Sequence, residues 1–162
     1  MFCTISNPHY ILQNSTSIAG QWFGYFSYGP DYGPDLEGEK VTFSFLIEEL
    51  HSGQFKGKCI ELKGIGSSEE VSIIQGFTEN GFISFTKEYQ LYTTFDEHGN
   101  ELPYGGSLAP RLSYKGNYNQ FNNTYNGTWE MCANEIPFGD GTFVDLATGL
   151  WEMGRDSATY GA

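Results

Sequence analysis

Four polar side chains fall on strand faces that are otherwise apolar, which is where a small-molecule site places its anchoring groups. Lys87 and Tyr89 share one strand face with Ile83 and Phe85, and Tyr114 and Asp145 lie on similar faces of two later segments. If these faces point inward, a cation, a carboxylate and phenols meet in an apolar interior walled by tryptophans. The candidate ligand residues are Trp22, Lys87, Tyr89, Tyr114, Trp129, Asp145 and Trp151.

Other roles compete with a ligand site at these positions. The Lys87 side chain can run along apolar surface to reach solvent at the end of the fold, and Asp145 can cap the turn after residues 140–141. A small enzyme with an acid–base pair at the mouth of the fold is a further alternative, with Asp145 and Lys87 as its candidate groups. These alternatives differ in whether the two charges lie inside the fold.

Signatures of catalysis are otherwise sparse. The chain has no Gly-x-Ser-x-Gly sequence, and His9, His51 and His98 fall in predicted loops or termini. Glu130 and Glu152 occupy equivalent places in two Gly-x-Trp-Glu-Met sequences, but strand alternation directs each away from its neighbouring tryptophan. We therefore name no catalytic residue, expect no cofactor, and favour a protein without enzymatic activity over an enzyme.

Metal and disulfide sites are not expected either. Residues 31–39 carry four carboxylates, but they lack the glycine and glutamate spacing of a calcium loop, so we interpret them as a solvated acidic loop. The three cysteines are widely spaced and form no Cys-x-x-Cys pair, which fits a reducing compartment. Cys59 and Cys132 fall in predicted strands and are interpreted as small buried residues.

Charge and composition limit the partners. The 162 residues carry 20 Asp and Glu against 8 Lys and Arg, a net charge of -12, which repels nucleic-acid phosphates and anionic lipid headgroups. The first 19 residues have no Lys or Arg and no apolar run of signal-peptide length, and no stretch of the chain is apolar enough to span a membrane. We expect a cytoplasmic protein that binds neither nucleic acid nor membranes.

Alternation of apolar and polar residues is the dominant pattern. In residues 40–50 four apolar side chains share one face, and only Leu46 breaks the alternation. An Asn-Gly pair at 80–81 and an Asp-Gly pair at 140–141 indicate hairpin turns, because both supply the positive φ that such turns need. The predicted strands are residues 20–28, 40–50, 55–62, 71–78, 82–94, 111–119, a segment around Trp129, and 143–153.

These strands predict an all-β chain. Consecutive strands joined by short turns favour an up-and-down arrangement, and closure into a barrel removes the exposed edges of an open sheet. We predict a single antiparallel eight-stranded β-barrel at residues 20–162, with residues 1–19 as an N-terminal extension packed across one end. Residues 90–110 are interpreted as an extra hairpin or exposed flap with its tip near 97–100.

All three tryptophans follow a glycine two positions earlier, at Trp22, Trp129 and Trp151. The Gly-x-Trp that opens the first strand, with Arg155 near the end of the last, resembles the structural signature of the calycin group: lipocalins, fatty-acid-binding proteins and avidins. The repeated Gly-x-Trp, together with residues 83–89, is most similar to avidin-like barrels. The resemblance implies a calycin-like barrel in which Trp22 closes one end and Arg155 stacks across it.

The ligands of those families are not implied. The polar residues with which avidins hold biotin are not matched, and the secretion signal and disulfides typical of lipocalins are not seen. A haem-binding barrel of the nitrobindin kind also opens with Gly-x-Trp-x-Gly, but it needs a late histidine, and none lies in the last three predicted strands.

Eight-stranded barrels either fill their interior with side chains or hold one small ligand. We expect a small apolar or aromatic molecule inside the barrel. The alternative is a non-catalytic interaction module, in which the 13 Phe and 11 Tyr fill the interior and the outer surface or residues 90–110 engage another protein. Association into a homo-oligomer is neither required nor excluded by the pattern.

Overall fold

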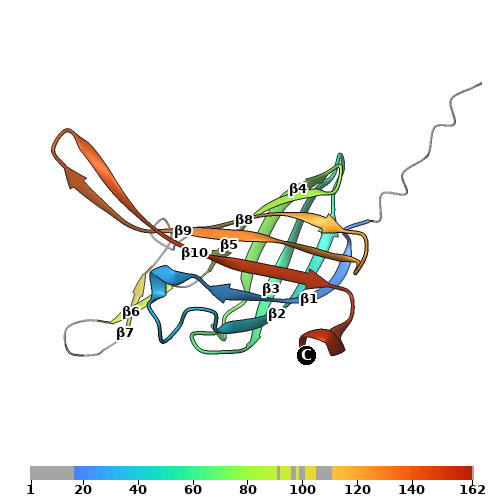
Figure 1. Cartoon of the computed structure of the whole chain (residues 1–162), viewed down its shortest axis with the longest axis horizontal. Coiled ribbons are helices and arrows are strands. Elements are labelled where there is room, and N and C mark those ends of the chain that lie inside the picture. The colour runs from blue at the N-terminus through green and yellow to red at the C-terminus, as the bar shows by residue number, and fades with distance from the viewer. Residues whose placement is uncertain (1–16, 91, 96–97, 99–100, 105–110, 162) are drawn as a thin grey trace, which may run out of the picture.

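The computed structural model describes residues 17–90, 92–95, 98, 101–104 and 111–161. Eight antiparallel strands close into a barrel in the order β1-β10-β9-β8-β5-β4-β3-β2 (Figure 1). Neighbours along the chain are neighbours in the barrel, which confirms the predicted all-β, up-and-down architecture. The strands are β1 (Gly20–Tyr28), β2 (Lys40–Glu49), β3 (Gln54–Lys63), β4 (Ser72–Glu79), β5 (Phe82–Tyr89), β8 (Arg111–Asn119), β9 (Thr124–Phe138) and β10 (Gly141–Gly154).

One hairpin lies outside the barrel order. β6 (Tyr92–Phe95) and β7 (Glu101–Tyr104) pair with each other as a separate sheet between β5 and β8. The strand predicted at residues 82–94 is therefore two strands, because β5 ends at Tyr89. The extra hairpin predicted in residues 90–110 is present, while most of its tip and residues 105–110 lie outside the described residues.

Alternation decides which side chains enter the barrel. In β2, Val41, Phe43, Phe45 and Ile47 are buried, whereas Leu46 is 62% exposed. Leu46 lies between two inward-facing residues, so the pleat of the strand directs it outward in spite of its apolar character. The residue that breaks the sequence pattern therefore leaves an aliphatic side chain on the outer surface.

The two C-terminal Gly-x-Trp sequences face each other across the sheet. In the register of β9 and β10, Trp129 lies opposite Gly149 and Trp151 lies opposite Gly127. A Cβ atom at position 149 would lie 2.4 Å from Nε1 of Trp129. The glycine that makes room for this indole thus belongs to the neighbouring strand and not to the tryptophan's own motif.

The two predicted hairpin turns behave differently. Asn80 and Gly81 have φ of 49° and 80° and form the turn between β4 and β5, as predicted. The turn between β9 and β10 is centred one residue earlier than predicted, because β9 ends at Phe138 and β10 begins at Gly141. Gly139 supplies the positive φ, 59°, that closes this turn.

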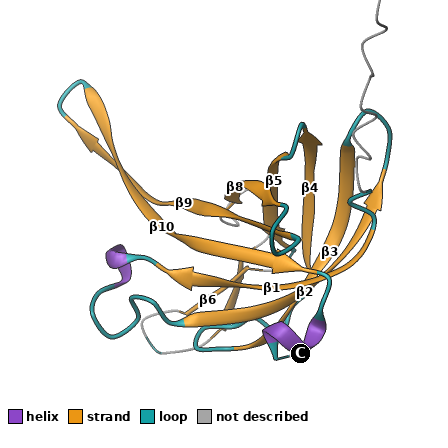
Figure 2. Ribbon diagram, turned by 45° about the vertical axis from the view of Figure 1, so that its right-hand side comes forward, coloured by secondary structure: helices purple, strands orange, loops and turns teal. Residues whose placement is uncertain are grey.

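The two ends of the barrel differ in their connections (Figures 1 and 2). Short turns join β2 to β3, β4 to β5 and β8 to β9 at one end, the short-turn end. The long connections leave the opposite, loop-rich end. They comprise residues 29–39 with the 3-10 helix η1 (Pro30–Tyr32), residues 64–71, the β6–β7 hairpin, and a ribbon of β9 and β10 that extends past their pairings with β8 and β1.

An arginine ties the entering chain to the short-turn end. The Arg155 guanidinium lies 3.9 Å from the centre of the Trp22 ring and donates hydrogen bonds to the carbonyls of Ser17 and Ala19. The Trp22 indole donates to the Ile18 carbonyl at 2.7 Å. Residues 17–19 therefore pack on the barrel, and residues 1–16 lie outside the described part.

No helix among the described residues has the length and apolar character of a membrane span.

Candidate functional site

A buried ion pair lies inside the barrel toward the loop-rich end. The side chains of Lys87 on β5 and Glu61 on β3 are each 1% exposed, and Lys87 Nζ donates a hydrogen bond to Glu61 Oε1. The Tyr89 hydroxyl donates to the same oxygen. Glu61 Oε2 accepts a hydrogen bond from the Ser68 backbone amide at 2.6 Å. Both carboxylate oxygens are therefore satisfied by the protein itself.

Strand register brings these groups together from segments distant in sequence. β4 lies between β3 and β5, and its residue Ser72 pairs with Cys59 on one side and Tyr89 on the other. Ser72 is fully buried and small. The long side chains of Glu61 and Lys87 can therefore meet across β4 inside the barrel.

Burial of this pair is costly. Removing a carboxylate and an ammonium from water costs several kcal/mol per ion, and an apolar pair of similar volume often fills the same space with equal or better stability. Packing alone gives no reason for charges at Lys87 and Glu61. Buried ionisable groups with a specific charge partner are concentrated at functional sites. The ion pair is therefore the centre of the candidate site.

The surroundings keep the lysine protonated. Burial by itself would lower the pKa of Lys87, but its interactions with Cys59, Tyr114, Tyr89 and Glu61 raise that pKa well above its ordinary value. Burial also raises the pKa of the Tyr89 and Tyr114 hydroxyls. At neutral pH the cluster therefore holds an ammonium and neutral phenols, which can orient a bound molecule but supply no free amine as a nucleophile.

Aromatic rings extend from the ion pair toward the surface. Lys87 Nζ lies 5.0 Å from the ring centre of Phe26, within the range of a cation–π interaction. Tyr28 and Tyr32 are half-buried, with ring centres 4.7 Å apart. The Tyr32 ring lies 6.1 Å from that of Trp129. These rings give the loop-rich end a partly exposed aromatic rim.

Residues 64–71 contact both the rim and the ion pair. The Tyr28 hydroxyl donates a hydrogen bond to the Ile65 carbonyl at 2.7 Å. A Cβ atom at Gly66 would lie 2.6 Å from that hydroxyl, so the absence of a side chain permits the close approach. The Ser68 amide that donates to Glu61 belongs to the same loop. Residues 64–71 thus form one hydrogen bond with Tyr28 and one with Glu61.

Of the predicted ligand residues, Lys87 belongs to the ion pair, and Tyr89, Tyr114 and Trp129 lie near it. The rings of Tyr114 and Trp129 are 6.4 Å apart. Trp151 is also buried, 5.9 Å from Tyr114. Trp22 lies at the short-turn end, beneath Arg155, and is not part of this group. The tryptophans are thus distributed along the barrel and do not line one site.

The structure changes the expected partner of Lys87. The alternative in which this side chain reaches solvent is wrong, because it is 1% exposed. β10 pairs Asp145 with Asn134 in the ribbon beyond the pairing of β8, and the Asp145 side chain lies outside the described residues. The counter-ion is Glu61, which the sequence interpretation missed. The sequence feature that could have identified Glu61 is its position two residues after Cys59, which places both side chains on the same face of a predicted strand.

The acidic loop has a structural contact and no described metal site. The Asp31 carboxylate accepts hydrogen bonds from the amide and hydroxyl of Thr148 at 3.2 and 3.0 Å, which ties the loop to β10. Within the described part of the chain, no group of three or more His, Cys, Asp or Glu side chains could hold a metal ion. Cys59 is fully buried, as interpreted, and burial raises the pKa of its thiol.

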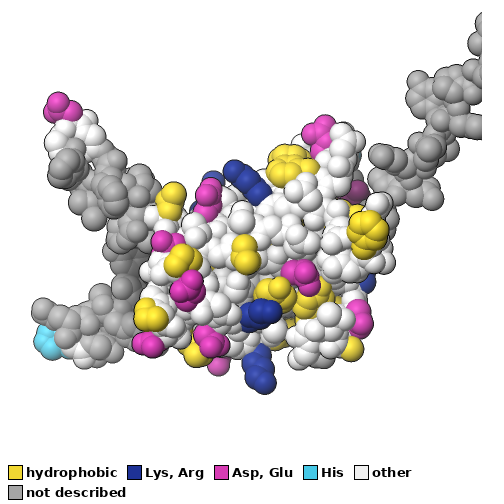
Figure 3. Space-filling view, in the orientation of Figure 1, with side chains coloured by type: hydrophobic (Ala, Val, Ile, Leu, Met, Phe, Trp, Pro, Cys, Tyr) yellow, Lys and Arg dark blue, Asp and Glu magenta, His cyan; other side chains and the backbone are white. Residues whose placement is uncertain are grey.

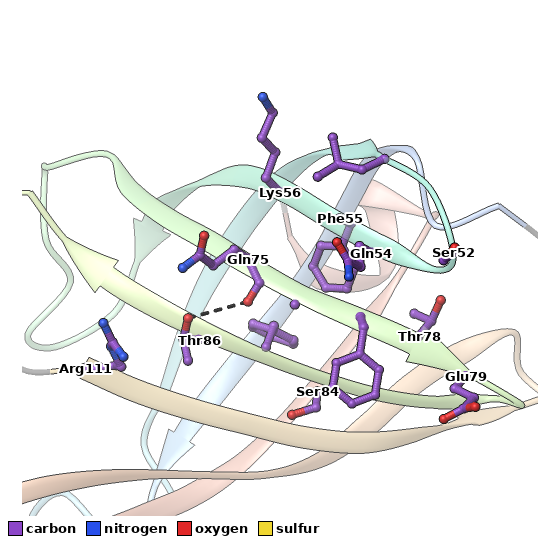
Figure 4. A pocket seen from close by; sticks show the side chains of 14 residues that line it. Ser52, Gln54, Phe55, Lys56, Gln75, Thr78, Glu79, Ser84, Thr86 and Arg111 are labelled. Carbon is purple, nitrogen blue, oxygen red and sulfur yellow. Dashed lines mark hydrogen bonds between the residues drawn. The ribbon is translucent and has the colours of Figure 1, made fainter.

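A separate hollow of about 700 Å³ lies on the outer side of β3, β4 and β5 (Figure 4). Gln54, Lys56, Gln75 and Thr86 line it, with Arg111 at its far side. These strands face the ion pair with their inner surface, so the hollow lies on the opposite side of the sheet from Lys87 and does not belong to that site.

Comparison of the chain with protein families, with curated proteins and with solved structures finds no match. The closed eight-stranded barrel is established by the strand pairing alone.

Proposed function

We propose that this protein binds a small apolar or aromatic molecule at the loop-rich end of the barrel, above the Lys87–Glu61 pair. The observation that carries the proposal is the juxtaposition of a fully buried, internally neutralised ion pair with half-buried tyrosines at one end of a barrel. Ligand pockets typically combine apolar walls with a few convergent polar groups. Membership of the calycin group and a cytoplasmic location remain part of this proposal.

The charges at the site favour a ligand without a strong charge of its own. Lys87 and Glu61 neutralise each other, so they add no net charge that would attract an ion. Tyr28 and Tyr32 contribute ring faces, which stack on planar molecules with little loss of conformational entropy. A ligand would contact the rim residues Tyr28 and Tyr32. The ion pair lies deeper in the barrel and would hold β3 and β5 in position beneath the ligand.

Native mass spectrometry of the protein purified from its source organism is the direct test. A non-covalent adduct that disappears on denaturation supports the proposal and reports the ligand mass. A second test uses the neutral fluorescent probe N-phenylnaphthylamine. We expect Tyr32→Ala to weaken probe binding about tenfold, the equivalent of about 1.4 kcal/mol for one lost aromatic contact.

Phe121→Ala is the matched control, because Phe121 is 92% exposed in the turn between β8 and β9, at the opposite end. Probe binding should be unchanged in this variant. An apo mass together with probe affinity that is equal in Tyr32→Ala and wild type would refute a site at the loop-rich end.

The alternative function is an interaction module with a filled barrel. It is favoured by the middle of the barrel, where the Phe85 ring stacks on Tyr114 at 4.7 Å and meets Trp151 edge-on at 5.3 Å. Rings at these distances leave a ligand little space at that level. An apo mass spectrum and a stable complex with another protein would favour this alternative.

A further inference from the structure

The exposed lysines of this acidic protein are concentrated on one hairpin. On the face that Figure 3 shows, acidic side chains are more common than basic ones. Of the eight Lys and Arg residues, four lie in β2 and β3: Lys40, Lys56, Lys58 and Lys63. Residues 40–63 contain only three acidic residues, and one of them is the buried Glu61. The hairpin therefore has a positive outer surface on a chain of net charge -12.

The same surface carries exposed aliphatic side chains. Leu46, Ile60 and Leu62 are 62%, 48% and 45% exposed. The register places Leu46 opposite Lys58, and Ile60 opposite Ser44. Within the described part of the chain, Lys58 forms no salt bridge, so its charge is available to a partner. Aliphatic groups and ammonium groups thus lie side by side on the outer face of β2 and β3, which we call the basic–apolar face.

We propose that the basic–apolar face docks an acidic polypeptide segment with interspersed apolar residues, an interaction separate from the proposed ligand site. Charge complementarity selects this partner. In a two-fold dimer of this chain the same positive surfaces would meet and repel each other. A membrane with anionic lipids would attract the face but repel the remainder of the acidic protein.

The partner side chains would meet two kinds of contact. Carboxylates of the partner would pair with Lys58 and Lys56. In the structure Lys56 Nζ forms an exposed salt bridge with Glu48 at 3.6 Å, which the partner carboxylate would replace. Apolar side chains would cover Leu46 and Ile60. Exposed ion pairs are individually weak, so affinity would come from the aliphatic contacts, and the lysines would contribute selectivity for acidic sequences and a dependence on salt.

The test uses a fluorescein-labelled peptide of alternating Glu and Leu, long enough to span β3, with binding followed by fluorescence anisotropy. We expect binding that weakens as salt increases. Lys58→Glu should lower the affinity about tenfold, the equivalent of about 1.4 kcal/mol, and Ile60→Ser should lower it as well. Lys115→Glu, which reverses an exposed lysine on β8, is the matched control and should leave affinity unchanged.

Circular dichroism of each variant shows whether the barrel is intact, and backbone NMR shifts locate the peptide in the wild-type protein. Shifts confined to β2 and β3 support the proposal. Absence of peptide binding, equal loss in Lys58→Glu and Lys115→Glu, or shifts elsewhere on the barrel would overturn it. Binding of phosphatidylserine vesicles in preference to the peptide, or a dimer that Leu46→Ser dissociates, would also overturn it by assigning the face to another occupant.

Discussion

Replacement of Lys87 by Met tests the energetic role of the buried ion pair. The methionine has a similar length and suits the apolar surroundings, but it leaves the Glu61 carboxylate buried without its cation. Breaking a buried pair in this way costs about 3–5 kcal/mol. For a chain of this size each kcal/mol lowers Tm by about 2–4 °C, so we expect a decrease of about 10 °C.

The double variant Lys87→Met/Glu61→Met separates the cost of an orphaned charge from the cost of altered packing. With both charges removed, we expect stability within about 2 kcal/mol of wild type, and therefore higher than that of Lys87→Met alone. Urea unfolding followed by tryptophan fluorescence measures all the free energies, since Trp129 and Trp151 are buried in the same core.

Lys115→Met provides the reference for loss of an exposed lysine, for which changes are usually within about 0.5 kcal/mol. If Lys87→Met destabilised the protein no more than Lys115→Met, the ion pair would not be buried as described. If the double variant were as unstable as the single one, the loss would come from packing and not from the unpaired Glu61.

Three other perturbations test separate features. Gly149→Ala should destabilise the barrel by about 1–3 kcal/mol, because the new methyl group would lie 1.9 Å from the Ser27 carbonyl oxygen and 2.4 Å from the Trp129 indole nitrogen; urea unfolding measures this. Arg155→Ala should cost about 1–3 kcal/mol through lost charged hydrogen bonds and should change Trp22 fluorescence. Because the folded-state pKa of Lys87 is raised, its contribution to stability is complete below about pH 10 and is lost as pH rises through the folded-state pKa; urea unfolding across alkaline pH measures the loss.

Each of these tests has a control. Gly154→Ala is the matched control, because its backbone is not left-handed and its new methyl group would approach no atom closer than 3.1 Å, so a loss as large as that of Gly149→Ala would contradict the steric argument. Arg155→Lys keeps the charge but not the planar donors and should restore only part of the stability. A Lys87→Met variant whose alkaline loss of stability equals that of wild type would disconnect that loss from the lysine.

Local pattern determines the strands and the faces of their side chains. The alternation in residues 40–50 depends only on the pleat of one strand, and the turn at residues 80–81 depends only on two left-handed positions. The strand count, closure and up-and-down order follow from these local features, because hairpins pair neighbours in the chain. The faces on which Lys87 and Tyr89 lie were therefore predictable from the sequence.

The partner of Lys87 was decided by tertiary structure. Lys87 and Glu61 lie on different strands with β4 between them, so their contact depends on the register of two hairpins and on the small Ser72. A shift of one residue in either register would turn a side chain to the opposite face of the sheet. Asp145, which has an equally suitable local pattern, lies in the ribbon beyond the barrel.

The position of the site was likewise beyond the sequence pattern. Connection lengths can be read along the chain, but the clustering of the long connections at one end follows from alternating strand direction within a closed barrel. That closure places Tyr28, Tyr32 and residues 64–71 at the same end of the barrel as the ion pair. The sequence by itself thus determined the barrel and its aromatic interior, whereas the register across non-neighbouring strands decided which polar groups meet inside it.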